Sequence, residues 1–266
     1  MSRNESKGRG IRDTRGIRDT RGIRDTRGIR GVLFDLFGTV VAYGDIEAGT
    51  RLAWEGIYSV LQRLGGCVPF DAFAREWQAQ FLTPLQPQEH VAGETPFVSK
   101  LLRQFAYYGL PMDRQAAREA AERCLAGWDA HTLLPEDAAP TLKALRARGY
   151  GLALVTNFDH PPYVRALLRE RGLAGLFDTV VISGEVGCDK PDARIFRLAL
   201  ERLGLAPQEA LVVGDSLDAD IAGAAAVGCA PVLVDMRAAH TDYPGPRITR
   251  LSQVLALLPE RPAPQG

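Results

Sequence analysis

Four short polar motifs carry the side chains of this chain that are best suited to chemistry. In chain order they are LFDLFGT with Asp35, LVTN with Thr156 and Asn157, DKPD with Lys190, and VVGDSLDAD with Asp215 and Asp220. Together they supply a carboxylate nucleophile, hydroxyl and amide donors, a cation, and further carboxylates that suit a divalent metal. Attack on a phosphoryl group through an aspartyl-phosphate needs this set of groups.

Strands that end at the motifs are predicted to position these side chains. GVLFDLF, GLALVTN and EALVVGD are apolar, β-branched runs, and each leads into one motif. From Pro135 onward, strand-type runs alternate with segments of helical spacing, which predicts an α/β fold with a doubly wound, Rossmann-like parallel sheet. Ligands of such sheets bind at the carboxyl ends of the strands, so we expect Asp35, Thr156 and Asp215 to meet in one crevice.

A different pattern separates the first motif from the rest. Residues 42–131 contain four segments of helical spacing and no strand-type run between them, which predicts a smaller, all-helical cap domain. The α/β core is then expected to comprise residues 31–41 and 132–266. Aromatic residues of the cap such as Trp54, Tyr58 and Phe97 are expected to pack in its core, because helical aromatic stripes usually pack.

Composition excludes several classes of protein. The net charge is zero, with ten Lys/Arg against four Asp/Glu in residues 1–30 and 22 against 28 in the rest, so the body does not resemble a nucleic-acid-binding domain. Residues 1–30 include three copies of RGIRDT and are expected to be a disordered basic tail, because one Ile in six residues cannot form a core. Four scattered cysteines and the lack of a long apolar run predict a cytoplasmic protein without a membrane partner.

Each polar motif also has a structural interpretation. Asp35 is a carboxylate at the end of an apolar strand, which is costly unless it is paired, functional or a helix cap. Lys190 precedes a helix start, where a cation is unfavourable unless it faces an anion. Asp215 is the strongest candidate ligand for Mg²⁺, with Asp220 in support, although one aspartate of this motif is also expected to cap the next helix.

The motifs in combination resemble those of the haloacid dehalogenase-like hydrolase superfamily, with the cap inserted after the first motif. DLFGT, TN, DKPDARIF and GDSLDADIAGA carry the resemblance, which extends from residue 31 to about residue 258. The resemblance implies that Asp35 is the nucleophile and that Thr156 binds the transferring group. It further implies that Lys190 neutralises charge and that Asp215, with the backbone carbonyl of Phe37, holds Mg²⁺.

One position departs from the phosphatases of this superfamily. They carry a second aspartate two residues after the nucleophile, which protonates the leaving group, whereas this chain has Phe37 there. That residue resembles the 2-haloacid dehalogenase branch, while Asp215 with Asp220 resembles the metal-dependent phosphoryl enzymes. We therefore expect a Mg²⁺-dependent hydrolase of a small phosphorylated metabolite. The alternatives are a C–halogen hydrolase and a binding or regulatory protein with little turnover.

Overall fold

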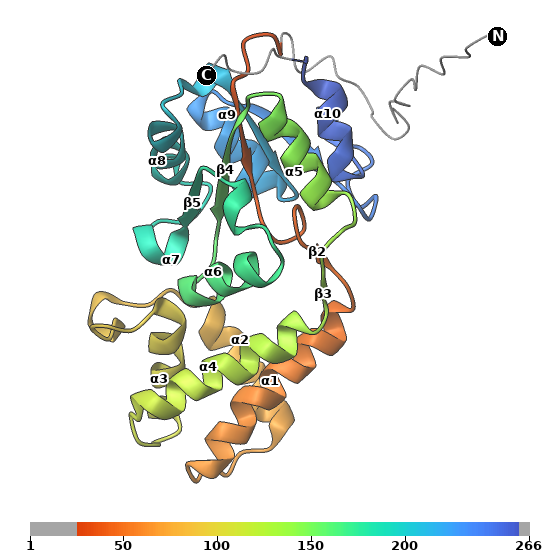
Figure 1. Cartoon of the computed structure of the whole chain (residues 1–266). Helices are drawn as coiled ribbons and strands as arrows, with labels where there is room; N and C mark the ends of the chain where they lie inside the picture. The colour runs from red at the N-terminus through yellow and green to blue at the C-terminus, as the bar shows by residue number, and fades with distance from the viewer. Residues whose placement is uncertain (1–25, 261–266) are drawn as a thin grey trace, which may run out of the picture.

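A six-stranded parallel sheet forms the centre of the larger domain in the computed structural model, which describes residues 26–260 (Figure 1). The strand order is β5-β4-β1-β6-β7-β8. The strands are β1 (Gly31–Phe34), β4 (Gly151–Thr156), β5 (Thr179–Ile182), β6 (Ala210–Gly214), β7 (Ala230–Val234) and β8 (Arg247–Ile248). The doubly wound sheet predicted from the sequence is confirmed.

Helices cover both faces of the sheet, as the continuous apolar strands require. Alternate residues of β1 point to opposite faces, so Phe34 packs in one core cluster and Leu33 in the other. The first face is covered by α5 (Ala138–Ala147), α6 (Pro161–Glu170) and α10 (Val254–Leu257), and the second by α8 (Ala193–Leu203) and α9 (Gly223–Val227). The short α7 (Ser183–Val186) follows β5 at the carboxyl edge.

The smaller domain consists of four helices that follow β1 in sequence. They are α1 (Ile46–Arg63), α2 (Phe70–Leu82), α3 (Pro96–Tyr107) and α4 (Arg114–Asp129). Three of them begin at a side-chain cap: Asp45, Thr95 and Asp113 each accept a hydrogen bond from a backbone N–H of the first turn. The apolar faces of all four meet in one buried cluster, which includes Phe73, Leu101 and Phe105.

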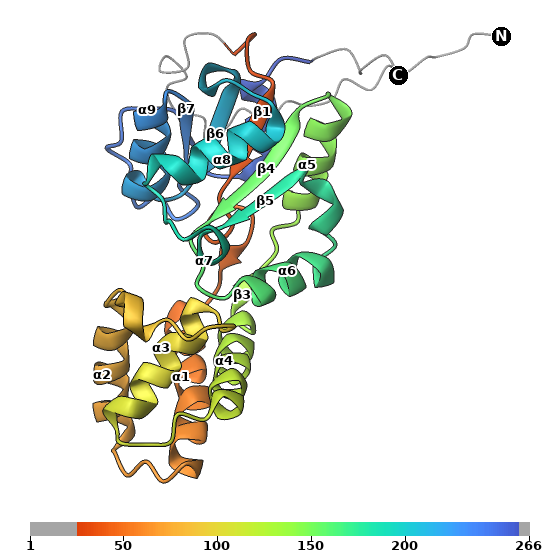
Figure 2. The ribbon, with the colours of Figure 1, turned by 90° about the vertical axis from the view of Figure 1, so that its left-hand side faces the viewer.

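Two short strands join the domains. β2 (Ala42–Tyr43) and β3 (Thr132–Leu133) pair antiparallel between the sheet and the helices (Figures 1 and 2). Arg237 from the core donates to the carbonyls of Tyr43 and Gly44 at 2.9 and 3.1 Å. Arg171 donates to Asp129 and Thr132 at 2.8 and 2.7 Å. Both strands of the connection are therefore fixed to the core by arginines.

The structure corrects three details of the sequence prediction. The apolar spacing of residues 248–258 favours one helix, but Ile248 belongs to β8 and the helical part is η6 (Leu251–Gln253) with α10. β2 and β3 were too short to leave a pattern. Ile29 is 2% exposed and packs in the core, so the core begins before Gly31. Most of the predicted basic tail lies outside the described residues.

Membrane insertion was not expected from the sequence. No helix in the described part of the chain is long and apolar enough to cross a membrane.

Candidate active site

Three neighbouring strands bring the predicted catalytic residues together at the carboxyl edge of the sheet. Thr156 is the last residue of β4, and Asp35 and Asp215 directly follow β1 and β6. The Asp35 N–H donates to the carbonyl of Val213 at 2.9 Å, which ties the segment after β1 to β6. All three side chains line one cavity, as the sequence predicted. Their chemical roles stay predictions.

Lys190 reaches this edge from the loop between α7 and α8. Its Nζ donates to Asp35 Oδ1 at 2.6 Å and to Asp220 Oδ1 at 2.7 Å. The three side chains are 3%, 9% and 2% exposed, so the ion pairs are shielded from water. Because an ammonium group carries three N–H donors, one donor of Lys190 remains for a ligand. The lysine predicted to face an anion thus faces two carboxylates.

The aspartates outnumber the cation in this cluster. When Asp35, Asp215 and Asp220 are all ionised, they carry three negative charges against the single positive charge of Lys190, which leaves two in excess. Burial raises the pKa of Asp35 to about 6, against the opposing effect of Lys190. Burial, followed by the charges of Asp35 and Asp220, raises the pKa of Asp215 to about 7. The protein therefore concentrates more negative charge here than its own residues balance.

The same cluster fits a divalent cation such as Mg²⁺. One oxygen from each of Asp35, Asp215 and Asp220 lies within 4.8 Å of the others. Asp35 Oδ2 is buried and has no hydrogen-bond partner among the described residues. Carboxylate oxygens are the ligands that Mg²⁺ prefers, and two excess charges match the charge of the ion. Gly38, at φ +91°, makes room, since a Cβ there would lie 2.0 Å from Asp215 Oδ2.

Asn157 is engaged differently from the prediction that it donates to the substrate. Its Nδ2 donates to the carbonyl of Lys190 at 2.9 Å, and its Oδ1 accepts from the N–H of Lys190 at 2.7 Å. These two bonds fix the backbone from which the Lys190 side chain extends. In this structure Asn157 positions the lysine, and only one of its N–H groups remains for a ligand.

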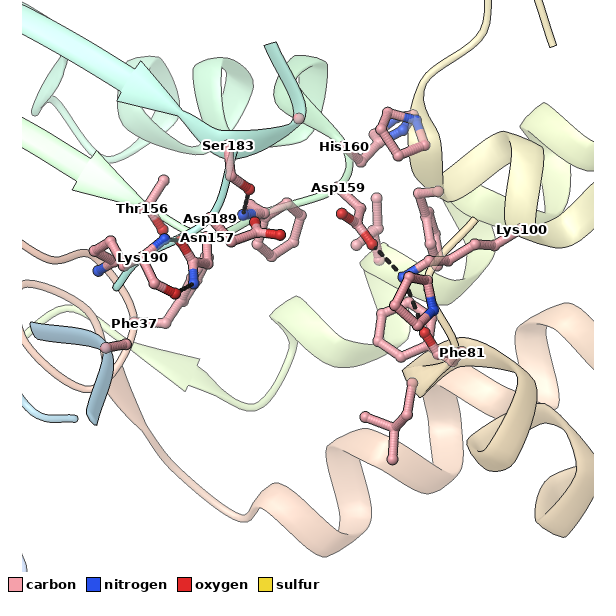
Figure 3. Close-up of a pocket in the computed structure, with 18 of the residues that line it drawn as sticks. Phe37, Phe81, Lys100, Thr156, Asn157, Asp159, His160, Ser183, Asp189 and Lys190 are labelled. Atoms are coloured by element: carbon pink, nitrogen blue, oxygen red, sulfur yellow. Dashed lines mark hydrogen bonds and ion pairs between the residues drawn. The ribbon is translucent and has the colours of Figure 1, made fainter. Parts of the chain in front are cut away.

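The cavity extends from the carboxylates to the cap and has a volume of about 1090 Å³. Its cap end is lined by aromatic side chains and by one lysine. They are Trp77, Phe81, Phe97, Lys100 and Trp128, with Tyr43, Phe37 and Phe158 toward the core. Figure 3 shows Thr156, Asn157 and Lys190 grouped on one side of the view and Phe81, Asp159 and Lys100 on the other.

Comparison with known sequences settles the family. The sequence profile of the haloacid dehalogenase-like hydrolases matches residues 29–228. The chain belongs to this family. The resemblance inferred from the four motifs is therefore confirmed, and the protein is a hydrolase of the haloacid dehalogenase-like type.

Several curated relatives of this hydrolase are named as phosphatases. A ribulose-1,5-bisphosphate 5-phosphatase of Halopiger xanaduensis is 33% identical over 77% of this chain and 84% of its own length. A phosphoserine phosphatase of Thermus thermophilus is 46% identical over 46% of this chain. The match spans 48% of the Thermus protein, so this hydrolase covers about half the length of that relative.

Solved structures from two branches of the family resemble this fold equally well. A phosphatase of Thermococcus onnurineus has a TM-score of 0.64, is 27% identical, and is matched over 88% of this chain and 99% of its own. A 2-haloacid dehalogenase of Pseudomonas syringae also has a TM-score of 0.64, at 24% identity over 86% of this chain and 97% of its own. The fold alone therefore does not distinguish phosphoryl from C–halogen chemistry.

Aromatic packing explains how this hydrolase accommodates Phe37 at the position where a general acid was expected. Its ring is 7% exposed and packs against Trp128 of the cap at 4.7 Å between ring centroids. It also packs against Phe158 at 5.3 Å and Tyr163 at 6.4 Å. Phe37 thus belongs to an aromatic cluster at the junction of cap and core. The side chain offers no proton donor toward Asp35.

Sequence reasoning missed the residues that form the cap end of the cavity. Trp54 and Tyr58 pack against the cap core as expected, but Phe97 both packs there and lines the cavity. Lys100 and Asp159 form an ion pair at 2.6 Å although 59 residues separate them. No local pattern links these two positions, because the contact exists only after the cap docks on the core.

Proposed function

We propose that this hydrolase is a Mg²⁺-dependent phosphatase that acts on a small phosphorylated molecule with Asp35 as its nucleophile. The observation that carries the proposal is the cluster of Asp35, Asp215 and Asp220, whose oxygens lie within 4.8 Å of one another. When ionised, these carboxylates carry two more negative charges than Lys190 balances. The phosphatase names of curated relatives support the same reaction class. The free thiols of all four cysteines fit the proposal that it acts in the reducing cytoplasm.

The first step proposed is in-line attack of an Asp35 oxygen on phosphorus. The new O–P bond forms as the bond to the leaving oxygen breaks, and the leaving group departs with the electron pair. In the second step, water attacks the phosphorus of the aspartyl-phosphate and releases inorganic phosphate, and Asp35 regains its carboxylate. Bound Mg²⁺ would supply positive charge beside the transferring group and lessen its repulsion of the carboxylates.

The neighbouring residues are assigned to binding the phosphoryl group, neutralising its charge and holding the metal ion. Lys190 orients Asp35 through its bond to Oδ1 and offers its remaining N–H to a phosphoryl oxygen. The Thr156 hydroxyl lies at the end of the adjacent strand and lines the same cavity, where it can donate to the phosphoryl group. Asp35, Asp215 and the carbonyl of Phe37 would hold the metal. Asp220 supports it from beside Lys190, to which it is bonded.

Phe37 shapes the substrate preference in this proposal. A general acid typically accelerates a reaction by about 10²–10⁴-fold, and this help matters most for leaving groups of high pKa. Since Phe37 cannot donate a proton, the enzyme should favour aryl phosphates, acyl phosphates and phosphoanhydrides over simple alkyl esters. Its rate should depend steeply on the pKa of the leaving group.

The rival function is C–halogen hydrolysis, and Phe37 is the observation that favours it. Asp35 would attack carbon and halide would leave without a proton. The excess of carboxylates around Lys190 opposes this function, since a departing halide is itself an anion. The third function is that of a protein that binds phosphate and Mg²⁺ without turnover. The absence of a general acid at the position of Phe37 favours this function as well.

One experiment separates these functions. Phosphate release from phenyl phosphate and halide release from chloroacetate are measured with Mg²⁺ and with excess EDTA, with Asp35→Asn as the matched control. The phosphatase should release phosphate only with Mg²⁺ and only with Asp35. Halide release that persists in EDTA would establish the dehalogenase instead. Absence of both products, with phosphate and Mg²⁺ still bound in titration calorimetry, would establish the binding protein.

A further inference from the structure

Charged residues are unevenly distributed along the cavity. Among the described residues that line it there is no arginine, and the only lysines are Lys190 at the carboxylate end and Lys100 at the cap end. A substrate with a second anionic group would need a cation at the cap end, where the part of the molecule beyond the phosphate must lie. Whether Lys100 can provide it is decided by its contacts.

The charge of Lys100 is already balanced within the protein. Its Nζ donates to Asp159 Oδ2 at 2.6 Å and to the carbonyl of Phe81 at 2.9 Å, and it lies 4.4 Å from the centroid of the Phe81 ring (Figure 3). The two hydrogen bonds engage two of the three N–H groups of the ammonium, and the Phe81 ring attracts its charge from a third side. The side chain is 12% exposed, and the charge of Asp159 balances its own. A ligand anion would have to compete with Asp159 for this charge.

Two further polar side chains that line the cavity, Glu94 and His160, also have partners within the protein. Both oxygens of Glu94 accept from Arg118, at 2.6 and 3.0 Å. His160 Nδ1 is hydrogen-bonded to Thr95 Oγ1 at 2.8 Å, and burial lowers the pKa of His160, which keeps the ring uncharged at neutral pH. Much of the remaining surface is apolar, and part of it is aromatic. The aromatic part is supplied by Trp77, Phe81, Phe97, Trp128, Phe37 and Phe158.

We propose that the group joined to the phosphate in the substrate is uncharged and apolar, with a flat ring as the best fit to the aromatic walls. This inference rests on the proposed phosphatase function and specifies its substrate class. A carboxylate or second phosphate at the cap end would lose its hydration without gaining a free cation. An uncharged ring would instead bury apolar surface against Trp128 and Phe81 and stack on their faces.

The test compares three aryl phosphates that differ in one substituent: phenyl phosphate, 3-carbamoylphenyl phosphate and 3-carboxyphenyl phosphate. The carbamoyl and carboxylate groups have the same shape, so they isolate the effect of charge. With Mg²⁺ present, kcat/KM should be at least about tenfold higher for the carbamoyl than for the carboxyl compound, chiefly through KM. Equal or better turnover of the carboxyl compound would overturn the inference.

Binding of the matched benzylphosphonates, which are not hydrolysed, keeps the inference separate from the function on which it rests. Titration calorimetry with Mg²⁺ should show the same preference for the uncharged ligand in Kd. A preference in binding without turnover of any ester would refute the phosphatase function alone. Turnover of esters with preferred binding of the carboxyl ligand would refute the substrate class alone.

A variant of the cap pair provides the converse test. Asp159→Asn removes the counter-charge of Lys100, so the preference for the uncharged ligand should fall at least about threefold in Kd. Glu119→Gln is the matched control, because Glu119 pairs with Arg63 and Arg123 on the cap outside the cavity. An unchanged preference in Asp159→Asn, with a normal melting temperature, would show that Lys100 does not control charge selection.

Discussion

The two ends of the cavity each hold a lysine in an ion pair, but they differ in burial and in charge balance. Lys190 faces Asp35 and Asp220 at 2.6 and 2.7 Å with Asp215 nearby, whereas Lys100 faces the single carboxylate of Asp159 at 2.6 Å. The first end keeps an excess of negative charge, and the second is neutral. The comparison teaches that a buried ion pair marks a reactive site only when its charges do not cancel.

The strongest test of this difference is the removal of the nucleophile at the unbalanced end. Asp35→Asn keeps the size of the side chain and should lower kcat by at least about 10⁴-fold, because the amide cannot form the covalent intermediate. Steady-state phosphate release and circular dichroism measure activity and folding. A well-folded variant that retains activity would remove the covalent mechanism.

Substitution of the proposed metal ligand at the same end should have the next largest effect on turnover. Asp215→Asn removes one charge from the cluster and should lower turnover by about 10³-fold and weaken Mg²⁺ binding. Asp218→Asn is the matched control, since Asp218 is an exposed aspartate of the same segment. Mg²⁺ titration of activity and calorimetry provide the measurement. Full activity of the Asp215 variant in excess EDTA would contradict a metal-dependent reaction.

Phe37 lies between the two ends of the cavity, and a variant at this position tests whether a proton donor is missing there. Phe37→Asp should raise the rate on an alkyl phosphate relative to an aryl phosphate by about 10²-fold, because the new carboxyl can protonate the leaving oxygen. Phe37→Leu controls for the lost packing of the aromatic cluster. Equal wild-type kcat on both substrates would show that another residue already supplies the proton.

A balanced ion pair away from the cavity should affect stability and leave chemistry unchanged. Arg247 donates to Asp235, and both side chains are buried. Burial raises the pKa of Asp235, but Arg247 and the N–H groups of Ala239 and His240 outweigh it, so the net pKa lies below the ordinary value of 3.8. A carboxyl group whose pKa is depressed by folding stabilises the folded state fully at pH values above its pKa in the unfolded chain. This stabilisation is lost as the pH falls through its pKa in the folded protein.

The variant Asp235→Asn should accordingly cost about 3 kcal/mol in unfolding free energy at pH 7. Below pH 4 the difference from the wild type should shrink, since the wild-type carboxylate then becomes protonated. Urea unfolding at pH 7 and at pH 3 measures both effects, and phosphate release should stay unchanged at pH 7. A pH-independent difference would show that the charge of Asp235 does not stabilise the fold.

The smallest effect is expected at the N-terminus. Residues 1–30 are predicted to be dispensable for folding, but Ile29 is buried and Arg30 bonds Glu209 at 2.9 Å. A chain that begins at Thr26 should therefore melt like the full chain. A chain that begins at Gly31 should lose about 1.5–3 kcal/mol of unfolding free energy, because the buried Ile29 side chain is absent. Differential scanning calorimetry compares the two. Equal melting temperatures would make Ile29 irrelevant to stability.

Much of the core end could be predicted from the sequence because its residues are fixed by local pattern. Asp35, Thr156 and Asp215 each close an apolar strand, and parallel strands present their carboxyl ends at one edge. The four cap helices were also predicted from helical spacing, and the structure adds the caps Asp45 and Asp113 at two of them. Periodicity and strand ends are properties of neighbouring residues, so one sequence contains them.

The cap end could not be predicted, because it is formed by contacts between distant segments. The pairing of Lys100 with Asp159 depends on how the cap docks on the core. The two bonds from Asn157 to Lys190 depend on the path of a loop 33 residues away, and the amide in isolation resembles a substrate donor. β8 was hidden because its two residues precede a helical pattern.

The five residues from Thr156 to His160 belong to the core in sequence but reach both ends of the cavity. Thr156 lies beside the nucleophile, Asn157 fixes Lys190, and Asp159 and His160 bond Lys100 and Thr95 of the cap. A chimera that exchanged only the cap would thus lose its partners on this stretch. Grafting a cap from another family member should succeed only when the loop that contacts it is exchanged with it. Substitutions in the cap and in residues 156–160 must therefore be compatible with each other.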